Sequence, residues 1–209
     1  MNARLLPRLA LAIAALSLCS CAAVKVTDTT PAGAATTKAP RKVYVAPFSL
    51  AGANIKEHPM RKHPGKLGAE AQQLLADFLV AEISKSVAPA TRVSSPTAAG
   101  RDGWLVTGEI TRINEGSRFL RMAIGLGAGG TKLETNVSVQ SLPSRKAFLQ
   151  FRTSGGSGSM PGAATNPIPF SSAPSAALQA RLGVSDDAAR TARMITDRLA
   201  TQLGKKAAR

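Results

Sequence analysis

The 209-residue chain has only two cysteines, Cys19 and Cys21, and both lie near its beginning. A disulfide between residues two positions apart would be strained, because the Cα atoms of bridged cysteines need a larger separation. A structural zinc site needs about four ligands, and the chain offers no other thiolate. The two cysteines therefore predict neither a disulfide framework nor a zinc site.

Long apolar runs are also missing. The run from Leu9 to Leu18 has about ten residues, whereas a transmembrane helix needs about 20. This length is typical of the hydrophobic region of a signal peptide, and Arg4 and Arg8 provide the usual basic start. The following Leu18-Cys-Ser-Cys21 resembles the bacterial lipobox, in which small residues precede the lipidated cysteine. Cys21 fits this pattern, whereas Leu18 is too bulky for the position directly before Cys19.

We therefore predict a lipoprotein signal peptide over residues 1–20 and lipidation, including palmitate, at Cys21. An ordinary cleaved signal peptide and an uncleaved anchor are the alternatives. Two or three acyl chains would hold the protein firmly on the membrane. Ala22 after the cysteine, in place of aspartate, favours transport to the outer membrane. We expect the domain to face the periplasm from the inner leaflet of that membrane.

Aromatic and acidic residues are few. The chain has eight aromatic side chains, and its 27 Lys and Arg against 12 Asp and Glu give a net charge of +15. Removing residues 1–20 takes away two arginines and leaves +13. Export and the scarcity of aromatic stacking platforms disfavour a nucleic-acid partner. Anionic lipids, lipopolysaccharide and peptidoglycan are the anions within reach of a tethered domain, and a solvated basic surface with no specific partner is the alternative.

The predicted anion-binding residues lie in a basic loop over residues 56–66 and near a predicted hairpin. They are Lys56, Arg61, Lys62, Lys66, Arg112, Arg118 and Arg121.

The pattern along the chain predicts one domain over residues 42–209, preceded by a flexible tether over 21–41. The tether is rich in Ala, Thr and Pro and has no apolar periodicity. Apolar residues at helical spacing predict helices over 66–88 and 185–205, the second capped by Ser185. We expect an α/β (α+β) fold, with a mixed, mostly antiparallel sheet of about five or six strands and both helices on one face. The predicted strands cover residues 42–48, 103–113, 117–124, 131–142 and 146–152, and a long Gly/Ser/Pro loop covers 154–175.

The run GLGAGG over residues 125–130 matches the G-x-G-x-x-G pattern of dinucleotide-binding folds. That pattern needs a helix after the third glycine, whose N-terminus binds the pyrophosphate. Here period-2 alternation over residues 131–142 predicts a strand instead. We therefore expect no nucleotide and interpret the glycines as a structural bend between strands. The structural glycines are Gly125, Gly127, Gly129 and Gly130.

Catalytic patterns are also scarce. The only histidines, His58 and His63, flank Met60 in the basic loop, where surrounding positive charge opposes a metal cation. No G-x-S-x-G nucleophile elbow occurs. A hydrolase would require the acids near Glu109 and Glu115 to line one cleft. We expect no catalytic residues, no metal and no cofactor, and therefore no enzyme activity.

Five elements of the sequence carry a family resemblance: Val43-Tyr-Val-Ala-Pro-Phe48, Gly103-Trp-Leu-Val-Thr-Gly-Glu-Ile110, Glu115-Gly-Ser-Arg118, Arg121 and Ile124-Gly-Leu-Gly-Ala-Gly129. Together they resemble a family of proteobacterial lipoproteins known as a domain of unknown function, of the DUF4410 type. The resemblance covers about residues 40–205 and implies a small α/β envelope lipoprotein, similar in layout to curli-secretion-channel and periplasmic auxiliary lipoprotein domains. It implies no catalytic residues.

From these observations we expect a membrane-anchored accessory or structural protein of the cell envelope. It would bind protein partners or anionic envelope polymers. An auxiliary subunit of a secretion or transport assembly is the alternative, and a periplasmic hydrolase is a further one.

Overall fold

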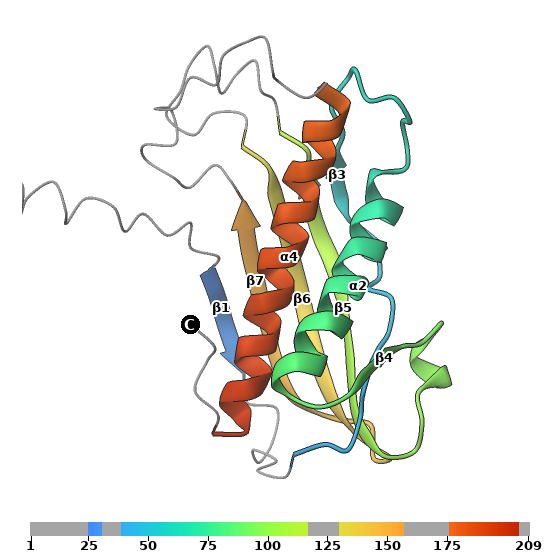
Figure 1. Ribbon diagram of the computed structural model, residues 1–209, viewed down its shortest axis with the longest axis vertical. Helices are drawn as coiled ribbons and strands as arrows, with labels where there is room; N and C mark the ends of the chain where they lie inside the picture. The colour runs from blue at the N-terminus through green and yellow to red at the C-terminus, as the bar shows by residue number, and fades with distance from the viewer. Residues whose placement is uncertain (1–24, 31–38, 117–129, 157–175, 205–209) are drawn as a thin grey trace, which may run out of the picture.

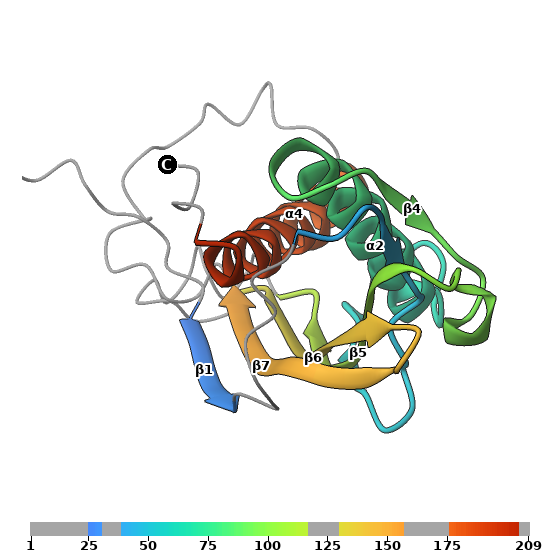
Figure 2. The same cartoon turned by 90° about the horizontal axis from the view of Figure 1, so that it is seen from below.

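The computed structural model describes residues 25–30, 39–116, 130–156 and 176–204 of the chain (Figure 1). These residues form one mixed sheet with two long helices on the same face (Figure 2). The predicted α+β class, the mixed sheet and the placement of both helices are therefore confirmed. The elements are β1 (Lys25–Thr30), β2 (Val43–Val45), β3 (Asn54–Lys56), α2 (Leu67–Ser86), β4 (Ala90–Arg92), the 3-10 helix η1 (Pro96–Ala98), β5 (Gly103–Asn114), β6 (Lys132–Leu142), β7 (Lys146–Gly156) and α4 (Ala176–Gln202).

The sheet has the strand order β1-β7-β6-β5-β2-β4. β7, β6 and β5 form an antiparallel meander, and β1 adds antiparallel to the outer edge of β7. The other edge of β5 is shared by two short parallel strands, with β2 beside its first residues and β3 beside its last. The sheet therefore has two distinct ends. One end carries β3 and the loop that follows it, and the other carries the start of β2 and the turn between β6 and β7.

The main core lies between the sheet and the helices. The helical periodicity of the sequence is confirmed, because the apolar positions Leu67, Leu75 and Leu79 of α2 are fully buried. Ala188, Ala192, Ile195 and Leu199 bury the facing side of α4. A smaller cluster of Ala46, Leu105 and Leu142 lies apart from this core. The run over residues 42–48 thus contributes apolar residues to two clusters, as its pattern predicts for a strand with cover on both sides.

Two predicted boundaries are wrong. Residues 25–30, predicted as part of the tether, form β1, in which Lys25 pairs with Ser154 of β7. The β-branched residues there favour an extended strand, and Val26 packs against the main core. The second helix begins at Ala176 rather than at Ser185. The alanine- and leucine-rich residues 176–182 are strong helix formers, so the helix runs on through Ser185 and Asp187.

The remaining predictions concern the strands and the glycine-rich segments. The predicted strands over residues 131–142 and 146–152 are confirmed by β6 and β7. Four of the predicted strands are present as β2, β5, β6 and β7, and the short strands β1, β3 and β4 raise the number among the described residues to seven. The predicted strand over 117–124, the glycines Gly125, Gly127 and Gly129, and nearly all of the 154–175 loop lie outside the described residues.

Candidate anion-binding surface

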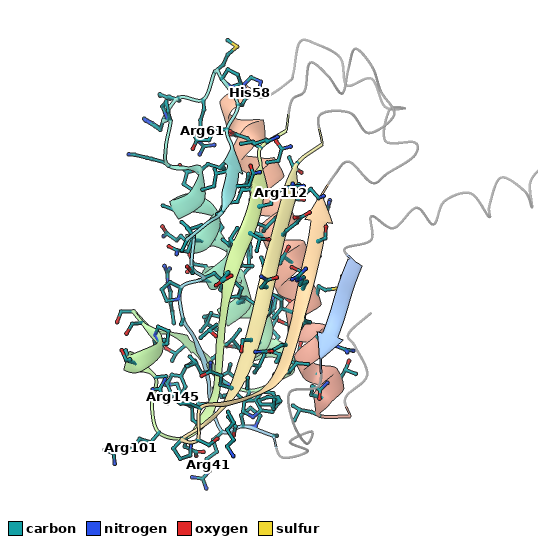
Figure 3. The ribbon with its side chains drawn as sticks, turned by 180° about the vertical axis from the view of Figure 1, so that it is seen from behind. Arg41, His58, Arg61, Arg101, Arg112 and Arg145 are labelled. Carbon is teal, nitrogen blue, oxygen red and sulfur yellow. The ribbon has the colours of Figure 1, made fainter. Side chains whose placement is uncertain are left out.

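The basic loop over residues 56–66 connects β3 to α2 at one end of the sheet, where Figure 3 shows His58 and Arg61. Its lysines Lys56, Lys62 and Lys66 are exposed, as an anion-binding role requires. Arg112 is exposed on β5 near the same end. Gly130 is half-buried and directly precedes Thr131 and β6. Arg118 and Arg121 lie outside the described residues.

Arg61 has a different role from the one predicted. Its guanidinium group lies 2.5 Å from Glu70 Oε2 and 2.5 Å from Glu115 Oε1. The side chains of Arg61 and Glu115 are only 9% and 2% exposed. A buried cation held by two carboxylates has no free positive charge to offer a ligand. Arg61 therefore links the basic loop to α2 and to the end of β5.

The remaining atoms of this cluster fix the loop backbone. The amide N–H of His58 donates to Glu115 Oε2 at 2.9 Å, and the amide N–H of Arg61 donates to the carbonyl of His58 at 3.0 Å. The Nε–H of Arg61 donates to the carbonyl of His63 at 3.2 Å. Arg61 and Glu115 together therefore define the path of the loop from His58 to His63.

Glu57 caps α2 from outside the helix. Lys66 occupies the N-cap position and makes no capping bond with its side chain. Glu57 instead accepts hydrogen bonds from the amides of Gly65, at 2.7 Å, and Leu67, at 3.0 Å. The bond from Gly65 and then that from Leu67 outweigh the cost of burial and hold the pKa of Glu57 below its ordinary value. The sequence signal for this cap is weak, because the acceptor lies ten residues before the helix.

Glu134 on β6 is occupied as well. Its Oε1 lies 2.7 Å from Lys132 Nζ and 3.9 Å from the guanidinium of Arg112. Burial acts to raise the pKa of Glu134, but the hydrogen bond and charge of Lys132 and the charge of Arg112 lower it below the ordinary value. The described acids around the loop are therefore each engaged by a cation or a backbone amide.

The exposed lysines of the loop differ from these acids, because the described residues provide them with no ion-pair partner. Lys56, Lys62 and Lys66 form no ion pair within the described part of the chain. Between them stands Met60, whose side chain is 88% exposed. Ile55 of β3 is the other large apolar side chain that the described residues expose, at 38%. The loop thus presents an apolar tip flanked by three lysines, which we call the lysine tip (Ile55, Lys56, Met60, Lys62 and Lys66).

β1 begins at the same end of the sheet, shortly after the predicted lipidation site in the sequence. Lys25 pairs with Ser154, and Ser154 pairs with Glu134. Glu134 in turn pairs with Arg112, which pairs with Asn54 at the start of β3. Lys25 and the base of the lysine tip therefore lie in one row across the sheet. Cys21 precedes Lys25 by four residues, and four residues span at most about 14 Å.

The acids considered for a hydrolase do not gather. Glu109 is exposed on β5, whereas Glu115 is buried against Arg61. Six residues of extended strand separate them, a distance of about 20 Å. Beside Glu115, His58 Nδ1 accepts a hydrogen bond from the amide of Met60 at 3.2 Å. His63 is exposed.

Comparison with protein families gives one match. The model of the domain of unknown function DUF4410 matches residues 43–173. The chain belongs to this family. The match covers the segments Val43–Phe48 and Gly103–Arg121 on which the resemblance rests. No curated protein matches this DUF4410 chain.

Several solved structures are similar to the DUF4410 chain. The PelC dodecamer from Paraburkholderia phytofirmans is 13% identical with a TM-score of 0.41, and the match covers 87% of this chain and 98% of PelC. A DUF330 protein from Xanthomonas campestris is 16% identical with a TM-score of 0.41, with coverage of 83% and 90%. A candidate lipoprotein from Caulobacter crescentus is 15% identical with a TM-score of 0.37, with coverage of 76% and 90%. Among the described residues of the DUF4410 chain, no helix has the length and apolar character to cross a membrane.

Proposed function

We propose that the protein is a lipid-anchored, non-enzymatic accessory protein of the cell envelope, and that its lysine tip contacts anionic phospholipid headgroups beside the anchor. The observation that supports this most strongly is the lysine tip itself. Three exposed lysines that form no ion pair with another described residue lie in or at the ends of the same loop as a methionine that is 88% exposed, while the acids nearby are engaged within the fold.

Physical estimates favour a membrane surface as the partner. A lysine near an anionic bilayer contributes about 1 kcal/mol, and an inserted apolar side chain contributes about as much or more. These contributions alone would hold a free protein only weakly. A lipid anchor at Cys21 would keep the domain at a high local concentration beside the bilayer, where weak contacts are sufficient to orient it.

The short link between Cys21 and β1 supports the same arrangement. Since the link spans at most about 14 Å, an anchored domain with β1 in place cannot move far from the bilayer. The row from Lys25 to Asn54 turns the lysine tip, rather than the opposite end of the sheet, toward that bilayer. The anchor therefore restrains the orientation of the domain as well as its location.

The anchor is tested by substitution of each cysteine. Cys21→Ser is expected to abolish palmitate labelling and to release the protein from membranes, whereas Cys19→Ser keeps both properties. Labelling is followed by metabolic incorporation, and release by fractionation of cells. Retained labelling of Cys21→Ser would overturn the lipidation site.

The headgroup contact is tested on the lipidated protein in liposomes by amide hydrogen exchange. We expect slower exchange over residues 54–66 in phosphatidylglycerol liposomes than in phosphatidylcholine liposomes. The Lys56→Ser/Lys62→Ser/Lys66→Ser variant should lose this protection. A matched variant, Arg41→Ser/Arg101→Ser/Arg145→Asn, removes three exposed cations at the other end and should keep it. Equal loss in both variants would contradict the proposal.

A further inference from the structure

The end of the sheet opposite the lysine tip gathers a second set of cations that the sequence pattern does not single out. β2 and β5 begin there, and β6 turns into β7. Val43 pairs with Trp104, Trp104 pairs with Ser141, and Ser141 pairs with Lys146, so three chain segments meet at one level. Figure 3 shows Arg41, Arg101 and Arg145 together at this end, away from His58 and Arg61. We call this set the arginine end; it comprises Arg41, Lys42, Arg101, Arg145 and Lys146.

Backbone contacts hold the three segments together. The amide of Trp104 donates to the carbonyl of Lys42 at 3.0 Å. Gly103 has φ +115, and a Cβ there would lie 2.1 Å from the oxygen of Lys42, so only glycine permits this approach. The guanidinium of Arg145 donates to the carbonyl of Pro96 at 3.1 Å and ties the β6–β7 turn to the segment before β5. The cations are therefore carried on a rigid frame.

The charge at this end is nearly all of one sign. All five cations are exposed, and the one acid among them is Asp102. None of the five forms an ion pair with another described residue. Near the lysine tip, by contrast, four glutamates offset the positive charge. Among the described residues, the arginine end is therefore the more strongly basic of the two ends.

Arg145 adds an independent observation. Its φ is +54, the left-handed conformation that Gly and Asn adopt readily and other residues rarely do. Turn stability alone would favour Gly or Asn at this position. In this conformation the Arg145 side chain is exposed and its guanidinium reaches Pro96, so the turn places a cation beside those of the other two segments.

We propose that the arginine end binds a polymer with repeated carboxylate groups, the chemistry that the peptides of the cell-wall peptidoglycan present. Cations on three separate turns match several spaced anions better than one small anion, which would need converging donors. Guanidinium groups bind carboxylates in bidentate geometry. The choice of the cell wall rather than lipid rests on the proposed function. If the lysine tip faces the bilayer, the arginine end lies about 26 Å further out, since eight residue steps of β7 separate Lys146 from Ser154.

The test is co-sedimentation of the full-length lipidated protein, in mild detergent, with purified peptidoglycan sacculi at low salt. Arg41→Ser/Arg101→Ser/Arg145→Asn is expected to weaken binding about tenfold. The charge-matched Lys56→Ser/Lys62→Ser/Lys66→Ser variant should bind within about twofold of the wild type. If both variants weakened binding equally, net charge alone would explain the effect and the proposal would be overturned. Unchanged binding of the arginine variant would overturn it as well.

Two further measurements complete the test. Sacculi whose carboxylates have been amidated should no longer co-sediment with the protein. Unchanged co-sedimentation would overturn the proposal that the arginine end binds carboxylates. Arg145→Asn loses the hydrogen bond to Pro96 but tolerates the left-handed turn conformation, so we expect it to unfold at a temperature close to that of the wild type. Weakened binding with unchanged stability therefore reports the lost cation. Sacculus binding is measured without a bilayer, so its failure is distinguishable from failure of the headgroup contact.

Discussion

At the scale of single residues, the basic loop contains two kinds of cation. Arg61 is buried between Glu70 and Glu115 and serves the fold, whereas Lys56, Lys62 and Lys66 are exposed. The sequence does not distinguish these four cations, so its pattern predicts anion binding for Arg61 as well. The distinction depends on Glu115, which lies 54 residues away in the chain. Local charge density predicted the surface correctly as basic but could not assign each cation.

Replacing Arg61 by methionine should destabilise the protein. The substitution keeps much of the side-chain volume but leaves Glu115 buried and unpaired, a loss of about 3 kcal/mol. Urea unfolding followed by circular dichroism measures the change. Adding Glu115→Gln should recover part of the loss, because the uncompensated charge is removed. If the single variant were as stable as the wild type, the structural role assigned to Arg61 in the buried ion pair with Glu115 would be contradicted.

Glu57 should make stability depend on pH. Because the folded-state pKa of Glu57 is lowered, its ionised form stabilises the fold above the ordinary value of 4.5. This contribution is lost as the pH falls through the lower folded-state pKa. Glu57→Gln should therefore be less stable than the wild type near pH 7, by up to about 1 kcal/mol. The gap should close below pH 4.5; a gap that persists in acid would contradict the charge-based cap.

At the scale of elements, short strands were harder to predict than long ones. The helices and the strands β5, β6 and β7 follow from their periodicity, because each buries one regular apolar face. β1 and β3 have only six and three residues. They are formed by pairing with a neighbouring strand, and their own sequences show no apolar periodicity that would predict them. The early start of α4 was missed for a related reason. Gly183 and Ser185 look like a helix boundary, yet the alanine- and leucine-rich residues before them are strong helix formers and extend the helix.

In the proposed arrangement β1 would set the reach of a lipid anchor at Cys21, and Val26 is the contact of β1 with the core. Val26→Asp should detach β1, because a carboxylate would be placed against apolar residues. We expect faster amide exchange along the outer edge of β7 and little change in β5 or β6. Val26→Thr retains the β-branched shape and should keep the protection of β7. If the exchange of β7 were already fast in the wild type, β1 would not restrain the anchor.

At the scale of the whole molecule, the domain has two basic ends of different character. The lysine tip combines charge with an exposed methionine, and the arginine end presents charge alone. The sheet holds them apart by the length of its central strands. Composition alone predicted the excess of positive charge. How that charge is divided between the two ends depends on strand pairing, which no local pattern encodes.

The most direct test of the proposed function is a fluorescent probe at Met60. The lipidated mature chain would have no free thiol, so Met60→Cys can be labelled at one position with an environment-sensitive dye. Ser144→Cys, exposed in the β6–β7 turn, is the matched control at the other end. In phosphatidylglycerol liposomes we predict a shift of emission to shorter wavelength for the probe at position 60 only, reversed by about 0.5 M salt. An equal shift at both positions, or none at position 60, would contradict the account.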